Sequence, residues 1–100
     1  MNNVKFELIE EGRGSFYLED GNEKVAEMEV GINGQEMTVY HTEVQPEGEG
    51  KGLAKMLLSA MVEHARANHL KVIALCTFVH LQFKKNAEQY KDIWQKQPTA

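Results

Sequence analysis

The amino-acid sequence predicts an α+β fold: a mostly antiparallel sheet that contains one parallel β-α-β pair, with helices at the C-terminal end. In residues 4–44, apolar and polar side chains alternate in short runs separated by glycine-containing turns, a pattern typical of antiparallel hairpins. From residue 53 onward, apolar residues recur every three or four positions, which is typical of helices. One short apolar run, residues 71–76, interrupts the helical pattern and predicts a buried strand.

Four strands are expected in the first half of the chain, over residues 4–9, 15–19, 23–32 and 35–44. The turn between the first two contains glycine, and the next two turns contain Asp20-Gly21 and Asn33-Gly34. Asp-Gly and Asn-Gly favour the positive φ angles of tight hairpin turns. In the third strand, alternate residues point to one face and predict a half-buried strand: Ala26, Met28, Val30 and Ile32. The four strands form an antiparallel meander.

A crossover unit is expected next. An amphipathic helix begins at Leu53 and fades near Asn68, and the apolar strand 71–76 follows it. A strand–helix–strand crossover joins parallel strands, so the strand that ends at Cys76 should lie parallel to the strand that ends at Val44.

Two further helices are expected at the C-terminal end. The first covers residues 77–85. Asn86 then caps a last helix, with Gln89 at the capping-box position. The apolar face of this helix consists of Ala87, Tyr90, Ile93 and Trp94. Core positions are predicted for Met56, Met61, Tyr90, Ile93 and Trp94.

Composition and length limit the class of protein. One hundred residues fit one domain with one core, covering residues 1–100. A net charge of −4 without a basic stripe argues against general nucleic-acid binding. No apolar run approaches the roughly 20 residues needed to cross a membrane, and the N-terminus lacks the features of a signal peptide. The single cysteine, Cys76, has no partner for an internal disulfide, so we expect a protein of the reducing cytoplasm.

The segment EGEGKGLAKMLL, residues 47–58, is the most informative part of the chain. Gly48, Gly50 and Gly52 alternate directly before the predicted helix, and a helix N-terminus behind a glycine turn is a natural site for phosphate. The spacing excludes a nucleotide-hydrolase P-loop, because Gly52 stands where serine or threonine binds magnesium. It also excludes a dinucleotide fingerprint. A purely structural strand-to-helix turn remains an alternative.

Two runs of sequence carry a family resemblance: TVYHTEVQPEGEGKGLAKMLLSAMVEHAR and the KVIALCTFV that follows it. In these runs the chain resembles the compact branch of the GCN5-related N-acetyltransferases, and the resemblance extends over roughly residues 25–95. The family's loop has the form Arg/Gln-x-x-Gly-x-Gly/Ala. The aligned residues here run from Glu49 to Ala54, in which Gly52 and Ala54 match and Glu49 replaces the arginine or glutamine.

The resemblance implies a cofactor and a site. Acetyl-CoA would bind with its pantetheine arm between the strands 37–44 and 71–76, held by backbone donors of Val44 or Gln45. Its diphosphate would bind to the loop made by Glu49, Gly50, Lys51, Gly52, Leu53 and Ala54. The acetyl group would lie near His41 and Cys76. The reaction implied is transfer of an acetyl group to an amine of a small molecule or a protein, with no nucleic-acid or membrane partner and no specified oligomeric state.

His41 and Cys76 are the candidate catalytic residues. An imidazole can serve as a base or proton relay, and the cysteine can accept the acetyl group or protonate coenzyme A. A cysteine attacks as the thiolate, so a nucleophilic role needs help from His41 or from the helix that begins near Thr77. Each residue also has a structural interpretation: Cys76 as a small buried hydrophobe and His41 as a hydrogen-bonded strand residue. Glu43 is a further possible base, acting through water.

Glu49 places a carboxylate where a diphosphate is expected, and Glu47 adds a second. Like charges about 6 Å apart repel by a fraction of a kcal/mol in water and by several in a sheltered site, and Lys51 and Lys55 can offset this. We therefore expect weakened cofactor affinity. The alternative function is a non-catalytic acyl-CoA-binding or protein-interaction domain with a degenerated cofactor loop. No metal is expected, because the histidines share no metal-ligand spacing with one another or with Cys76: His64, His69 and His80.

Overall fold

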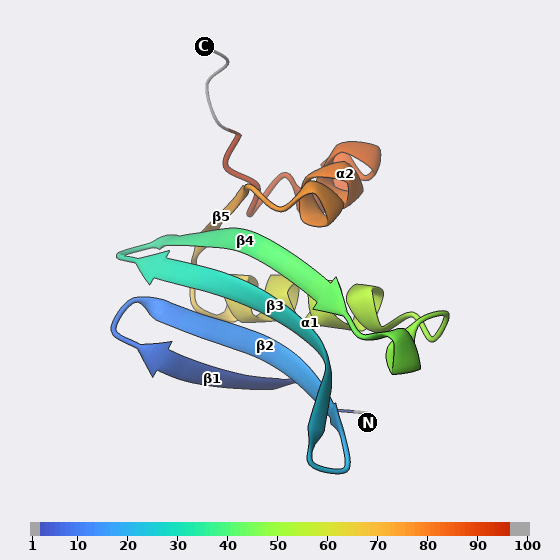
Figure 1. Cartoon of the computed structure of the whole chain (residues 1–100). Coiled ribbons are helices and arrows are strands. Elements are labelled where there is room, and N and C mark those ends of the chain that lie inside the picture. The colour runs from blue at the N-terminus through green and yellow to red at the C-terminus, as the bar shows by residue number, and fades with distance from the viewer. Residues whose placement is uncertain (1–2, 97–100) are drawn as a thin grey trace.

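The computed structural model describes residues 3–96 as a five-stranded sheet with helices (Figure 1). The strands are β1 (Lys5–Glu10), β2 (Arg13–Asp20), β3 (Glu23–Asn33), β4 (Glu36–Val44) and β5 (Lys71–Ala74). They lie in the order β1-β2-β3-β4-β5. The first four pair antiparallel, whereas β4 and β5 pair parallel. The predicted fold class is confirmed, including its one parallel pair.

The helical elements are η1 (Pro46–Gly48), α1 (Leu53–Ala67), α2 (Thr77–Lys85) and α3 (Ala87–Tyr90). α1 connects β4 to β5 and runs across the sheet behind β3 and β4 in Figure 1. α2 packs against β4, β5 and α3. Among residues 3–96, no helix is long and apolar enough to cross a membrane.

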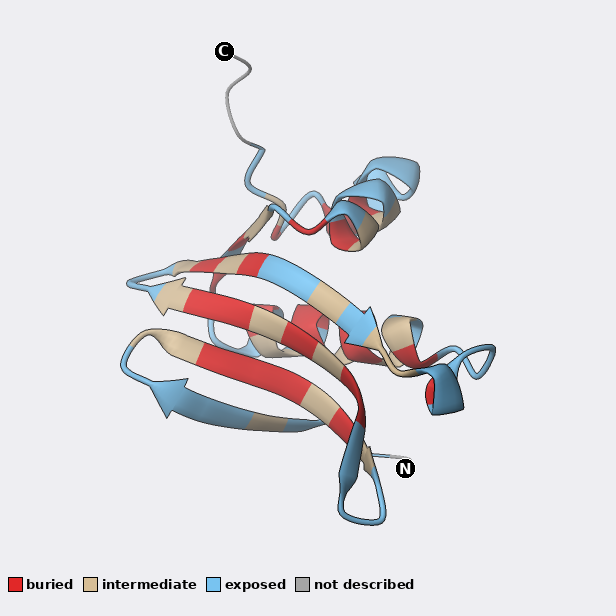
Figure 2. Ribbon diagram, viewed as in Figure 1, coloured by how far each residue is buried: buried red, intermediate tan, exposed pale blue. Residues whose placement is uncertain are grey.

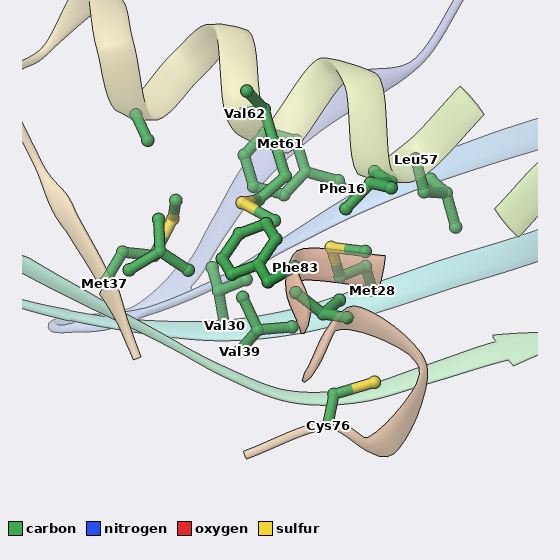
Figure 3. Packing of buried hydrophobic residues seen from close by; sticks show 14 of the residues in the cluster. Phe16, Met28, Val30, Met37, Val39, Leu57, Met61, Val62, Cys76 and Phe83 are labelled. Carbon is green, nitrogen blue, oxygen red and sulfur yellow. The ribbon is translucent and has the colours of Figure 1, made fainter. Parts of the chain in front are cut away.

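One hydrophobic cluster joins the sheet to both α1 and α2. In Figure 3, the Phe83 ring of α2 lies between Met61 of α1 and the strand residues Val30 and Val39. All four side chains are fully buried, so α2 is fixed to the sheet by the same core that holds α1. The edge strand β1 is mostly exposed, as Figure 2 shows.

A β-bulge in β4 changes which side chains face the core. Glu29 pairs with His41 and Val30 pairs with Val39, so Tyr40 is the extra residue. Beyond it, Thr42 lies opposite the fully buried Met28. Residues directly opposite each other share a face of the sheet. Thr42 therefore faces the core, and His41, paired with Glu29, faces the other side.

Two predicted elements are shorter than expected. β5 ends at Ala74, not at Cys76, because the amides of Leu75 and Cys76 both donate to the carbonyl of Val39, at 3.1 and 2.9 Å, and the chain turns into α2. The predicted last helix was wrong beyond Tyr90: α3 has four residues.

The segment after α3 pairs with β5. The amide of Val72 donates to Ile93 O at 2.7 Å, and the amide of Gln95 donates to Val72 O at 2.9 Å. Asn86 is the N-cap residue of α3, as predicted, but it makes no side-chain cap bond, because its side chain donates to Gln82 O of α2. Of the predicted core residues, Met61, Tyr90 and Ile93 are buried, whereas two are only half-buried: Met56 and Trp94.

Candidate functional site

The glycine turn between η1 and α1 is tightly packed at its start and open at its end. A Cβ on Gly48 would lie 2.6 Å from Leu53 Cδ1 and 3.3 Å from Val25 O. Gly50 and Gly52 have φ angles of +79° and +71°, and a Cβ on either would meet no atom within 4 Å. Gly48 thus allows the turn to pack on the core, and the other two glycines allow a left-handed backbone on an open surface.

The amides that follow this turn lack acceptors. Within residues 3–96, no hydrogen bond is donated by the amides of Gly50, Gly52, Leu53, Ala54 and Lys55. Gly52 is the N-cap residue of the 15-residue helix α1 and has no side chain to bond to them. Unpaired amides at a helix N-terminus, together with the helix dipole, form an anion-binding site.

The turn carries two acidic and two basic side chains, whose formal charges cancel. Glu47, Glu49, Lys51 and Lys55 are all exposed, and none of them forms an ion pair with another residue in the range 3–96. The first turn of α1 contains no acidic residue. The amides and the two lysines fit a diphosphate, and the two glutamates oppose it.

β4 has an open edge next to this turn. Its pairing with β5 stops at Val39 and Ala74, and beyond Val39 it pairs only with β3 in the part of the chain that is described. The amide of Gln45 donates to Val25 O of β3 at 2.8 Å, so it is not available to a ligand at the open edge. Backbone groups alternate in direction along a strand, and the groups of Thr42 and Val44 therefore point to the open edge.

Cys76 lies beside Thr42. Its Sγ is 3.3 Å from Thr42 Oγ1, and either atom can donate. Cys76 is 6% exposed and is the N-cap residue of α2. Its carbonyl accepts the amide of His80 at 2.9 Å. The thiol is thus shielded, close to a hydroxyl and at a helix N-terminus.

His41 is not brought to Cys76. It lies on the other face of β4, mostly exposed, with Nε2 3.9 Å from Glu43 Oε1. Sequence reasoning missed Thr42 as the neighbour of the thiol. Without the bulge at Tyr40, the alternation along β4 assigns Thr42 to the wrong face, and no sequence signal marks the extra residue.

The other histidines have different surroundings. His64 packs against the rings of Phe6 and Phe16, with centroid distances of 4.9 and 5.4 Å. His80 contacts Trp94 edge-to-face at 5.9 Å. Among the described residues, no three histidine, cysteine, aspartate or glutamate side chains are grouped as a metal site requires.

Comparison with known proteins identifies the family. Residues 15–93 match the family model described as GCN5-related N-acetyl-transferase. The solution structure of a GCN5-like candidate N-acetyltransferase from Staphylococcus aureus is 35% identical, with a TM-score of 0.70, and the match covers 98% of this chain and 94% of that one.

Two more distant structures share the fold. A ribosomal-protein-alanine N-acetyltransferase from Brucella melitensis is 15% identical, with a TM-score of 0.63, and the match covers 92% of this chain and 70% of that one. The structure of AAC(6')-Iy with the bisubstrate analogue CoA-S-monomethyl-acetylneamine is 12% identical, with a TM-score of 0.55 and coverages of 91% and 67%. The family match, together with the near-complete match to the Staphylococcus protein, shows that this chain belongs to the GCN5-related N-acetyltransferase family.

Proposed function

We propose that this protein binds acetyl-CoA and transfers its acetyl group to an amine. The observation that carries the proposal is the row of unpaired amides at the N-terminus of α1, at Gly50 and from Gly52 to Lys55, directly beside the open edge of β4. Such a row suits a diphosphate, and an open strand edge suits an extended amide-containing chain. Family membership and the coenzyme A analogue in the AAC(6')-Iy structure support the same cofactor.

In this proposal the two ends of the cofactor are held by different elements. The amides of Gly50 and of residues 52–55, with the side chains of Lys51 and Lys55, hold the diphosphate. The backbone of Val44 pairs with the pantetheine arm, and Gln45 contributes its carbonyl or side chain because its amide is bonded to Val25. Glu49 weakens binding through its charge.

Bound acetyl-CoA supplies an activated thioester to an uncharged amine. The amine must lose one proton and the coenzyme A sulfur must gain one. Cys76, shielded beside Thr42, is the group that we assign to the thioester, either as the acetyl acceptor or as the proton donor. His41 is exposed on the opposite face, and we assign it to taking a proton from the acceptor through solvent.

The acceptor is proposed to be an amine of a small molecule or a protein, and the reaction is proposed to take place in the cytoplasm, where the single thiol stays reduced. The names of two relatives refer to amine acceptors. One is a ribosomal-protein-alanine N-acetyltransferase, and the other is AAC(6')-Iy in complex with a bisubstrate analogue that contains acetylneamine. Their similarity to this chain is limited to the fold.

Glu49 favours a second candidate function, a non-catalytic acyl-CoA-binding or interaction module. Coenzyme A release from acetyl-CoA, followed with a thiol reagent, separates the two. Spermidine, a lysine-containing peptide and a peptide with a free N-terminus serve as acceptors, and the same peptides with blocked amines are the controls. The proposal predicts amine-dependent release. Binding of acetyl-CoA without such release for any acceptor would favour the module instead.

A further inference from the structure

A separate cavity shares no lining residue with the glycine turn or with the open edge of β4. Its volume is about 410 Å³, within the range of roughly 300–1,000 Å³ that is usual for small-molecule sites. It is formed by the end of β5, one flank of α2 and the segment after α3. The residues that matter for its chemistry are Ala74, His80, Lys84, Ala87, Trp94 and Lys96.

The cavity is lined by basic groups without acidic ones. His80 and Lys84 are four residues apart and therefore share one flank of α2. Lys96 approaches from the chain segment beside β5. No aspartate or glutamate lines the cavity, and neither lysine is ion-paired within residues 3–96. The side chains that line the cavity therefore carry a net positive charge, in a chain with a net charge of −4.

An aromatic and apolar wall lies next to these cations. The Trp94 ring contacts His80 edge-to-face at 5.9 Å, and Lys96 Nζ lies 5.0 Å from the centroid of the same ring. Ala74 and Ala87 also line the cavity. The lining thus combines an indole surface with the Lys96 ammonium held close to it.

A backbone donor also opens into the cavity. The amides of Lys71 and Leu75 donate toward β4, whereas that of Val72 donates to Ile93 on the outer edge of β5. By this alternation the amide of Ala74 points to the outer edge. Within residues 3–96 it has no acceptor, and Ala74 lines the cavity.

We propose that this cavity binds a small organic anion in which a carboxylate or phosphate is attached to a planar apolar group. The planar group packs against Trp94, Ala74 and Ala87. The anionic group accepts hydrogen bonds from Lys84 and from the backbone amide of Ala74. A charge-assisted bond at one end and an apolar contact at the other fix one orientation of the ligand.

Benzoate, benzamide and benzamidine test the proposal, because they are nearly isosteric and differ in charge. Phenyl phosphate extends the test to a phosphate. Amide-correlation NMR follows the Ala74 amide and the single indole N–H of the chain, which belongs to Trp94. We expect benzoate and phenyl phosphate to shift both signals saturably, and the neutral and cationic analogues to leave them unchanged.

Lys84→Gln and Lys85→Gln form a matched pair of variants. Both lysines are exposed in the last turn of α2, but only Lys84 lines the cavity. The expected result is an affinity for benzoate that is about fivefold weaker in Lys84→Gln and unchanged in Lys85→Gln. The proposal is overturned if benzamidine binds as well as benzoate, if neither anion moves the Ala74 and Trp94 signals, or if both variants bind benzoate as the unmodified protein does.

Discussion

The hydroxyl of Thr42 lies 3.3 Å from the thiol of Cys76, across the gap between β4 and the start of α2. A β-bulge at Tyr40 makes this contact possible, because it turns Thr42 toward the core face of β4. The thiol of the one cysteine is therefore held in a fixed position beside the open edge at which the cofactor is proposed to bind.

Replacement of Cys76 tests the role of the thiol. We expect Cys76→Ala and Cys76→Ser to lower the rate of acetyl transfer at least about tenfold, because each removes the group assigned to the thioester. Acetyl-CoA affinity should change little. Full activity in both variants, measured as coenzyme A release, would remove Cys76 from the mechanism.

Thr42→Val tests whether the hydroxyl positions the thiol. Valine keeps the β-branched shape but cannot hydrogen-bond, so we expect kcat to fall about threefold to tenfold while KM for acetyl-CoA stays the same. Thr38→Val, on the same strand but paired with Gly31 away from Cys76, is the matched control. Equal kcat values in the two variants would contradict a positioning role.

Glu49→Arg should strengthen coenzyme A binding about tenfold at low salt. The change removes a negative charge beside the proposed diphosphate site and adds a positive one. The gain should shrink as ionic strength rises, because both groups are exposed. Glu63→Arg, at an exposed position inside α1 and away from the glycine turn, makes the same change in net charge at a different place. If this control binds as tightly as Glu49→Arg in calorimetry, the effect is not local.

Gly48→Ala and Gly50→Ala separate packing from backbone strain in the turn. The Gly48 methyl group would press on Leu53 and Val25, so we expect about 1–3 kcal/mol of lost stability in denaturant unfolding. The Gly50 methyl group meets open space but requires φ near +79°, which costs about 1–2 kcal/mol. No measurable loss of stability in Gly48→Ala would contradict the close packing of the turn.

The Arg66–Asp92 ion pair predicts a pH dependence of stability. Arg66 Nε donates to Asp92 Oδ2 at 2.9 Å, and this hydrogen bond lowers the pKa of Asp92. A carboxyl with a lowered pKa stabilises the fold above its ordinary pKa near 4, and the contribution is lost as pH falls through the lowered value.

Asp92→Asn should therefore lower Tm by a few degrees at pH 7, the size expected for an exposed pair. The difference between variant and unmodified protein should shrink as pH falls below the ordinary pKa near 4 and through the lowered pKa of Asp92. Glu88→Gln, which removes the more exposed pair with Lys91 at 3.3 Å, should not change Tm measurably. A constant Asp92→Asn difference from pH 7 to pH 2 would mean that the charge of Asp92 is not the cause.

The strands of the first half were predictable from local chemistry. Each hairpin dipeptide carries its glycine at positive φ, +66° at Gly21 and +62° at Gly34, and the alternation between the turns sets the buried face of β3. The bulge was not predictable, because one extra residue at Tyr40 leaves no trace in the pattern of residue types.

The segment after α3, in contrast, could not be predicted from local residue types. Ile93 and Trp94 fall at helical spacing, yet their segment leaves the helix because the outer edge of β5 needs backbone partners. Both backbone groups of Val72 on this edge are paired: its amide donates to Ile93 O, and its carbonyl accepts from the amide of Gln95. A requirement set by a strand about 20 residues earlier overrides local propensity, so this part of the fold cannot be read from neighbouring residues.

The central claim is that the amides after the glycine turn hold the diphosphate of coenzyme A, and amide NMR during a coenzyme A titration tests it most directly. The signals of Gly50, Gly52, Leu53 and Ala54 should move saturably, whereas the hairpin glycines Gly21 and Gly34, which also have positive φ angles and open surroundings, should stay in place. Unmoved signals in the turn at millimolar coenzyme A, or equal movement of the hairpin glycines, would contradict the account.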